Sequence, residues 1–200
     1  MDNISSMTDI PKPGINDRIA ARVRELRNRQ GLSLEALADA SGVSRSMISL
    51  VERGESSPTA VVLEKLATGL GVSLATLFET PAAPPHPLSR RADQVEWRDP
   101  ASGYRRRNVS PDGFPSPIQI VEVNFPAGAR VAYETAARSG VTHQQVWVLQ
   151  GMIEVVLGEE RFELGTGDCL AMVLDRPITY HNPTSKSARY CVVIVAPRPG

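Results

Sequence analysis

The sequence predicts a two-domain protein of the α + β class, in which a helical N-terminal half precedes a half made of many short strands. Apolar residues recur at three- and four-residue steps through residues 15–79, whereas alternating and short apolar runs dominate residues 95–198. The intervening residues 80–94 begin with a proline-dense stretch that can continue neither a helix nor a central strand, so we expect a linker. Residues 1–14 have no such period and predict a flexible arm.

Composition and charge limit the classes of protein that this chain can be. The 200 residues carry no formal net charge, which argues against non-specific coating of nucleic acid but not against binding to a specific site. No apolar run reaches membrane-spanning length and the N-terminus is polar, so we expect a cytoplasmic protein with no membrane partner. Cys169 and Cys191 lie in apolar, strand-like runs, and we expect buried, reduced thiols.

The first helix is expected from Ile15 to a stop near Gly31, with Ile19, Val23 and Leu26 on its buried face. The same helix concentrates positive charge, and its arginines are Arg18, Arg22, Arg24, Arg27 and Arg29. A charge run of this kind is typical of a solvated helix face. Because of the motif that follows it, phosphate contact by a subset of these arginines is the alternative.

Two short helices joined by a glycine-containing turn come next. The first is expected over residues 33–40 and stops at Gly42. The second is expected over residues 44–53, with Ile48 facing inward and Gly54 supplying the left-handed stop. Two helices connected in this way form a helix-turn-helix.

Two further helices complete the helical half. Ser57 and Pro58 predict the start of a helix that ends at Gly71, because proline is favoured in a first helical turn. Ser73 is expected to cap a last short helix that contains Leu77. The sequence therefore predicts a bundle of five helices.

The helix-turn-helix resembles that of phage repressors and the bacterial XRE regulator family. The resemblance covers residues 15–79, and the matching positions are Ser33-Leu34, Leu37-Ala38, Gly42-Val43-Ser44, Ile48-Ser49 and Glu52-Arg53-Gly54. It implies a five-helix, lambda-repressor-like domain that binds double-stranded DNA through the second helix of the motif. The DNA-contacting residues that it implies are Ser33, Ser44, Arg45, Ser46, Ser49, Leu50 and Arg53.

Three residues of this domain have a more specific expected role. Arg45 can donate two hydrogen bonds to a guanine, a contact worth about 1–3 kcal/mol of discrimination. Leu50 either packs on a thymine methyl group or only seals the helix bundle. By the same resemblance, Arg27 and Glu52 are expected to form an interior ion pair that serves stability rather than DNA binding.

The C-terminal half predicts a sandwich or barrel of short strands. A hairpin is expected from the runs 95–97 and 104–108, which flank a turn of Asp, Pro, Ala, Ser and Gly. The other expected strands are residues 118–125, 146–150, 153–157, 161–164, 169–173, 178–182 and 190–195. Gly, Pro and Asp separate them, as in all-β domains.

Three segments of this half resemble the cupin family of jelly-roll barrels. They are Phe125-Pro126-Ala127-Gly128, Val146-Trp147-Val148-Leu149-Gln150-Gly151, and Gly165-Thr166-Gly167-Asp168 leading to His181-Asn182-Pro183. The resemblance implies a central pocket, which many cupins use to hold a metal. The positions that correspond to the family's ligands are Glu134, Ala136, Gln144 and Ile178. Three of these four are poor ligands, so we expect no metal and no other cofactor.

A pocket with apolar walls and a few polar groups is expected instead to bind a small-molecule effector. The candidate effector-binding residues are Tyr133, Arg138, His143, Gln145, Trp147, Tyr180 and His181. Arg130 and Arg176 either add positive charge at the mouth, which would favour an anionic effector, or are solvated turn residues. His143 and His181, joined by Glu134 or Tyr133, leave a rearranged metal site as an alternative.

Together the two resemblances imply a transcription regulator that is not an enzyme, with an N-terminal DNA reader and a C-terminal sensor. Dimerisation through the barrel is expected to make a homodimer that binds a rough inverted repeat. The residues ERG-E-S-SPT, the metal-poor barrel and the short Pro-Arg tail resemble the cupin-bearing regulators of sulfur utilisation, which implies sulfur or amino-acid effectors. The alternatives are a metal-dependent cupin oxygenase or isomerase with a regulatory DNA-binding domain, and an autoregulating antitoxin.

Overall fold

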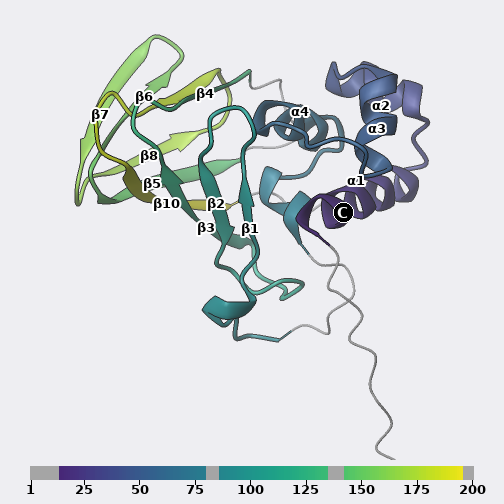
Figure 1. Ribbon diagram of the computed structural model, residues 1–200, viewed down its shortest axis with the longest axis horizontal. Helices are drawn as coiled ribbons and strands as arrows, with labels where there is room; N and C mark the ends of the chain where they lie inside the picture. The colour runs from purple at the N-terminus through teal and green to yellow at the C-terminus, as the bar shows by residue number, and fades with distance from the viewer. Residues whose placement is uncertain (1–13, 80–85, 135–141, 196–200) are drawn as a thin grey trace, which may run out of the picture.

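The computed structural model describes residues 14–79, 86–134 and 142–195. Helices occupy one side of the molecule and strands the other, and the two parts are in contact (Figure 1). The expected arm lies almost entirely outside the described residues, as does the first part of the expected linker. No helix among the described residues has the length and apolar character needed to cross a membrane.

The N-terminal part, called the head below, is a bundle of four α-helices and one 3-10 helix. Its elements are α1 (Ile15–Arg29), α2 (Leu34–Ser41), α3 (Arg45–Glu52), α4 (Ala60–Gly69) and the 3-10 helix η1 (Leu74–Phe78). Ser33, Ser44, Thr59 and Ser73 each accept a hydrogen bond from a backbone N–H in the first turn of the helix that follows. These caps satisfy N–H groups that have no partner within the helix.

Two expectations for the head need correction. The fifth element is a single 3-10 segment rather than an α-helix. The fourth helix begins at Ala60 with Thr59 as its N-cap, so Ser57 and Pro58 precede the helix instead of opening it. Proline at the first position was a plausible signal, but the hydroxyl of Thr59 reaches the Val62 N–H at 3.4 Å and sets the start.

The C-terminal part is a jelly-roll barrel of two antiparallel sheets, as the resemblance to cupins implies. The six-stranded sheet has the order β1 (Glu96–Arg98), β2 (Arg105–Asn108), β3 (Ile118–Phe125), β10 (Ala188–Val195), β5 (His143–Gln150) and β8 (Cys169–Val173). The four-stranded sheet has the order β4 (Arg130–Tyr133), β9 (Ile178–His181), β6 (Met152–Leu157) and β7 (Glu160–Gly165). The sequence did not predict β4, which has only four residues, one of them half-buried and two exposed.

Strand alternation decides what the barrel encloses. In β10, Ala188, Tyr190, Val192 and Ile194 are buried and point into the barrel, whereas the residues between them are exposed or half-buried.

Gly151 turns the chain from β5 into β6 with a φ of 80°, and a Cβ there would lie 3.1 Å from the Ala188 Cα. Both the left-handed conformation and the close approach require glycine at this turn.

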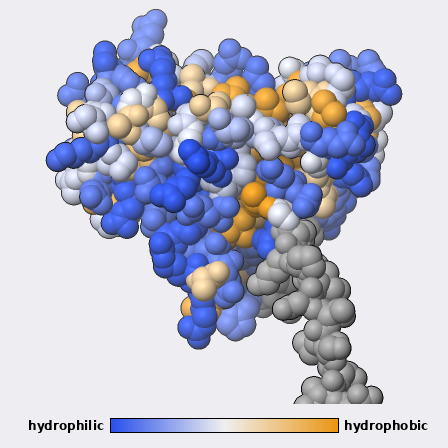
Figure 2. Space-filling model, viewed as in Figure 1, coloured by the Kyte–Doolittle hydropathy of each residue, from blue (hydrophilic) through white to orange (hydrophobic). Residues whose placement is uncertain are grey.

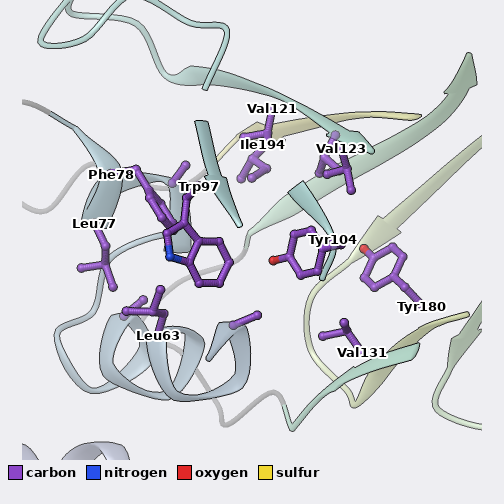
Figure 3. Close-up of a cluster of buried hydrophobic side chains, with 14 of the residues drawn as sticks. Leu63, Leu77, Phe78, Trp97, Tyr104, Val121, Val123, Val131, Tyr180 and Ile194 are labelled. Carbon is purple, nitrogen blue, oxygen red and sulfur yellow. The ribbon is translucent and has the colours of Figure 1, made fainter. Parts of the chain in front are cut away.

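The head and the barrel share one hydrophobic core. Phe78 of η1 packs against Trp97 of β1, with ring centroids 5.5 Å apart, and Leu63 and Leu77 lie on the head side of this contact (Figure 3). The expected linker therefore does not separate two independent bodies. Its described part, residues 86–94, contains a short 3-10 helix, η2 (Arg91–Asp93), and leads directly into β1.

Polar contacts accompany this apolar junction. The Ala60 N–H donates to Asp99 Oδ1 at 2.9 Å, and the Asn108 side chain donates to the Ala75 carbonyl at 3.3 Å. Gln119 of β3 donates to Glu79 at 2.8 Å. Figure 2 shows orange, hydrophobic surface gathered between the two parts, whereas the outer flanks are mostly blue.

Candidate functional site

The N-terminus of α3 presents three of the expected DNA-contacting side chains on the surface of the head. Ser44, Arg45 and Ser46 are exposed there, while Ile48 and Val51 are buried beneath the helix. The Ser44 hydroxyl accepts a hydrogen bond from the Met47 N–H at 3.3 Å and so caps α3. The buried residues fix the helix, and its exposed first turn carries the polar side chains.

Arg45 extends from this turn into solvent. Its side chain is 67% exposed, and Glu35, its ion-pair partner at 4.0 Å, is also exposed. Such an exposed, long-distance pair holds a side chain weakly. The guanidinium is therefore available to a partner that offers two acceptors.

The other expected DNA-contacting residues are less free. Ser33 accepts a hydrogen bond from the Ala36 N–H at 3.0 Å as the cap of α2. Ser49 and Leu50 are half-buried, and Ser49 accepts a hydrogen bond from Arg53. Arg53 also pairs with Glu55 at 2.7 Å. The half-burial of Leu50 is compatible with either of its two expected roles.

The expected ion pair between α1 and α3 is confirmed. The Arg27 guanidinium meets both carboxylate oxygens of Glu52, at 2.6 Å and 2.8 Å, and Glu52 is buried. The hydrogen bond to Glu52 raises the pKa of Arg27. Arg22 is also tied into the structure, by Glu25 at 3.0 Å and Glu79 at 3.1 Å. Arg27 and Arg22 thus belong to the packing of α1 and not to the subset expected to contact phosphates.

The second site is a cavity inside the barrel, lined by both parts of the molecule. Most of the residues that line the cavity come from the two sheets. Figure 3 shows six of them: Tyr104, Val121, Val123, Val131, Tyr180 and Ile194. The head contributes Glu64 of α4 and Ser73 and Leu74 near η1. The cavity has a volume of about 80 Å³, which is more than one water molecule needs.

Four tyrosines contribute half of the polar residues that line the cavity. The hydroxyls of Tyr104 and Tyr133 are 3.2 Å apart, and the Gln144 side chain donates to the Tyr180 hydroxyl. Tyr190 stacks on Tyr180, with ring planes inclined by only 5°. Burial raises the pKa of each of the four phenols, so all stay neutral at physiological pH and keep a proton to donate.

The structure separates the expected effector-binding residues into three groups. Tyr133 and Tyr180 line the cavity. His143, Gln145 and Trp147 are exposed on the outer face of the six-stranded sheet, so the expectation that they line the pocket is wrong. The reason is a one-residue error in alternation, because Gln144, Val146 and Val148 are the residues of β5 that point inward. Arg138 lies outside the described residues.

His181 is also displaced from its expected place. It lies 3.8 Å from Glu154 and does not line the cavity, whereas its neighbour Tyr180 does. His143 and His181 belong to different sheets, and each alternates with a residue that points inward. They therefore face opposite sides of the barrel and cannot share a metal ion.

The positive charge at the cavity comes from an unexpected residue. Arg176 pairs with Asp175 at 2.8 Å, and Arg130 is exposed, and neither lines the cavity. Arg106 does line it, and it is 5% exposed. The sequence does not indicate that Arg106 is buried, because β2 contains too few apolar residues to mark its inward face.

The donor set does not fit the metal that cupins commonly hold. Glu134 is exposed and pairs with Lys65 at 3.4 Å, while Gln144 is bound to Tyr180 and Ile178 has no donor atom. Ala136, the fourth corresponding position, lies outside the described residues. Within residues 14–79, 86–134 and 142–195, no three His, Cys, Asp or Glu side chains are grouped as metal ligands would be.

Both cysteines are free thiols, and one expectation about them is wrong. Cys169 is exposed and Cys191 is half-buried. In the strand register, both lie beside Trp147 on the outer face of the six-stranded sheet. Burial raises the pKa of Cys191.

Comparison with known proteins is consistent with this arrangement. A family model described as "Helix-turn-helix" matches residues 23–77. The HTH-type transcriptional regulator SutR of Escherichia coli is 28% identical over 90% of this chain and 96% of its own length. PuuR, a second E. coli HTH-type regulator, is 27% identical over 89% of this chain and 93% of its own.

A solved structure shares the whole architecture. The crystal structure of an HTH_3 family transcriptional regulator from Vibrio cholerae superimposes with a TM-score of 0.73 at 26% identity. The match covers 92% of this chain and 98% of that one. Both the helical part and the strand-rich part therefore have a counterpart in it.

Proposed function

Because the chain belongs to the helix-turn-helix transcriptional regulators of the XRE family and carries a cupin barrel, we propose that it binds an operator through α3 and a small effector in its barrel. The observation that carries the first half is the exposed first turn of α3. Arg45 extends from it into solvent, and the buried Ile48 holds the helix in place. That is the geometry with which a recognition helix enters the major groove.

Selection of bound DNA from a random pool tests the DNA-binding half. The selected sequences should contain a rough inverted repeat whose half-site centres are about 34 Å apart, one turn of DNA. Arg45→Gln should reduce discrimination at one base pair of each half-site by about 1–3 kcal/mol while leaving non-specific binding nearly unchanged. Arg105→Gln is the matched control, since Arg105 is an exposed arginine on β2, outside the helix-turn-helix. A wild-type protein that enriches no sequence would refute the proposal.

The cavity supports the sensing half. A molecule bound there would touch β-strands and also Ser73 and Leu74 of the head. A ligand shifts a conformational equilibrium only by as much as it prefers one state over the other. Contacts to both parts give the effector such a preference, because any change in how the head sits on the barrel changes those contacts.

The same cavity is proposed as a binding site rather than a catalytic one. Its polar groups are neutral phenols, an amide, the Ser73 hydroxyl, the Arg106 guanidinium and the Glu64 carboxylate, and they do not match a transition-metal site. Elemental analysis of purified protein tests this proposal against the metal-dependent cupin enzyme. Stoichiometric iron, zinc or manganese would refute it.

We further propose that the chain forms a homodimer through the outer face of the six-stranded sheet. Trp147 is 50% exposed there, and Ile118 and Val195 are 45% and 38% exposed on the same face. Large apolar residues exposed on one face of a sheet favour a protein–protein contact there. A second copy also supplies the second recognition helix that an inverted repeat requires.

Sedimentation and thiol reactivity test this contact. Trp147→Asp should convert a dimer into a monomer and should expose Cys169, its register neighbour, to a thiol reagent. Phe114→Asp is the matched control, because Phe114 is 42% exposed but belongs to a loop instead of the sheet. If Trp147→Asp and the wild type sediment alike and their Cys169 reacts equally fast, the contact is elsewhere or absent.

A further inference from the structure

Arg106 is a buried cation with an incomplete set of partners. Its side chain lines the barrel cavity at 5% exposure, and its Nε has no hydrogen-bond acceptor among the described residues. Within the described part of the chain, no carboxylate lies at ion-pair distance from its guanidinium, although neighbouring Arg105 and Arg107 each have one. Burial lowers the pKa of Arg106, but guanidinium groups stay protonated in proteins.

The surroundings of Arg106 are arranged as a partial anion site. The guanidinium carbon lies 4.5 Å from the centre of the Phe78 ring, a cation–π contact that orients the group. Tyr104, Tyr133 and Tyr190 line the same cavity as Arg106. Their neutral hydroxyls are hydrogen-bond donors, and donors gathered around a cation favour an anion between them.

A buried charge without a counter-ion is costly, and an anionic ligand held against it would supply the missing counter-charge. We propose that the cavity binds a small organic acid with a single carboxylate, which pairs with Arg106 and accepts hydrogen bonds from the tyrosine hydroxyls. Its apolar body would lie against Val121, Val123 and Val192. This inference rests on the proposed function, because it names the chemical class of the effector.

The cavity also limits what the acid can be. Glu64 lines the same space, so a second anionic group on the ligand would meet a carboxylate. The cavity volume of about 80 Å³ suits a short chain rather than a fused ring system. A monocarboxylate with a few carbon atoms satisfies both limits.

The position of Arg106 links such an acid to the head. Phe78, on which the guanidinium lies, belongs to η1 of the head, and Ser73 and Leu74 line the same cavity. Neutralising the guanidinium changes its cation–π contact with Phe78. Occupancy of the barrel is thereby transmitted to the DNA-binding part through one shared side-chain contact.

Titration of full-length protein with matched small molecules tests the proposal. The probes are propanoate and butanoate, with propanamide and 1-butanol as uncharged counterparts. We expect the two carboxylates to raise the thermal midpoint in a saturable way and to shift the Arg106 Nε–H resonance in ¹⁵N-arginine-labelled protein, and the neutral probes to do neither. Arg106→Met should weaken carboxylate binding at least tenfold, whereas Arg105→Met, which changes an exposed arginine of the same strand, should not.

The resonance shift in the wild type decides the case even if Arg106→Met does not fold. A carboxylate that leaves the Arg106 Nε–H resonance unmoved, or amides that bind as well as acids, would overturn the proposal. DNA selection in the absence of any probe distinguishes failure of the organic-acid proposal from failure of the proposed regulator function. An enriched operator without a carboxylate response refutes the organic acid and leaves the regulator intact, whereas no enriched operator refutes the regulator whatever the cavity binds.

Discussion

At the residue scale, the Glu52 carboxylate is the charge on which the head most depends. It is buried between α1 and α3, and Arg27 is its bidentate partner. Glu52→Gln keeps the shape of the side chain but leaves the half-buried Arg27 guanidinium without its counter-charge. Removing one partner of a buried pair costs about 3–5 kcal/mol, so we expect a loss of that size in the free energy of unfolding measured by urea titration.

An exposed ion pair provides the control for this prediction. Arg53 and Glu55 form a comparably short contact on the surface of the same domain. Solvent screens exposed pairs, so Glu55→Gln should leave the urea midpoint close to that of the wild type. Equal effects of the two substitutions would mean that burial of Glu52 does not determine its contribution.

Single residues also show where sequence reasoning works and where it fails. The Arg27–Glu52 pair was predictable from the resemblance to the repressors, because both positions lie in the domain that the resemblance covers. The inward face of β5 was predictable too, since Val146 and Val148 mark it, but polar Gln144 on that face made the exposed His143 look like the better ligand. Arg106 was not predictable, because an arginine flanked by two arginines carries no signal of burial.

At the scale of elements, the contact between α2 and α4 depends on Gly69. A Cβ at this position would lie 2.7 Å from the Ser41 Cβ and 3.0 Å from its backbone nitrogen. Alanine would stabilise the isolated helix by about 1 kcal/mol, but overpacking of a tight contact costs about 1–3 kcal/mol. We therefore expect Gly69→Ala to destabilise the protein, in spite of its better helix propensity.

Thr68→Ala, one position earlier in α4, should have the opposite sign. The Thr68 hydroxyl is buried without a hydrogen-bond partner among the described residues, so its removal relieves an unsatisfied group. Alanine also has the higher helix propensity. Urea titration of both variants distinguishes the steric explanation from propensity, because propensity alone predicts that both are stabilised.

Element boundaries were predictable wherever local chemistry sets them. Ser33 and Ser44 cap their helices as expected, and β3 and β8 have the expected bounds. The start of α4 was not predictable, because Pro58 and Thr59 both suggest a helix start and only one of them can set it. The strand β4 was not predictable either, because four residues are too few to show an alternation of buried and exposed side chains. Pairing with β9 on the far side of a long connection is what makes β4 a strand.

At the scale of the whole molecule, the sequence predicts two domains but contains no signal for the interface between them. Phe78 and Trp97 each look like ordinary core residues of their own domain, and only the fold places their rings 5.5 Å apart. The buried residues form one cluster that runs through both parts. We therefore expect the wild type to unfold in a single cooperative transition.

The two tryptophans of the chain allow this cooperativity to be tested directly. Trp97 is 3% exposed and packs in the junction between the two parts. Its truncation to alanine should lower the free energy of unfolding by about 3–5 kcal/mol. In Trp97→Ala, the remaining Trp147 reports on the barrel alone, while far-UV circular dichroism near 222 nm follows the helices. The two signals should separate into distinct urea midpoints, because the head has lost its main apolar contact with the barrel.

Trp147→Ala is the control, because it removes an exposed tryptophan from the outer face of the six-stranded sheet. In this variant, the circular dichroism and Trp97 fluorescence transitions should stay coincident. Coincident midpoints in Trp97→Ala would mean that the polar contacts of Asp99, Asn108 and Gln119 couple the two parts by themselves.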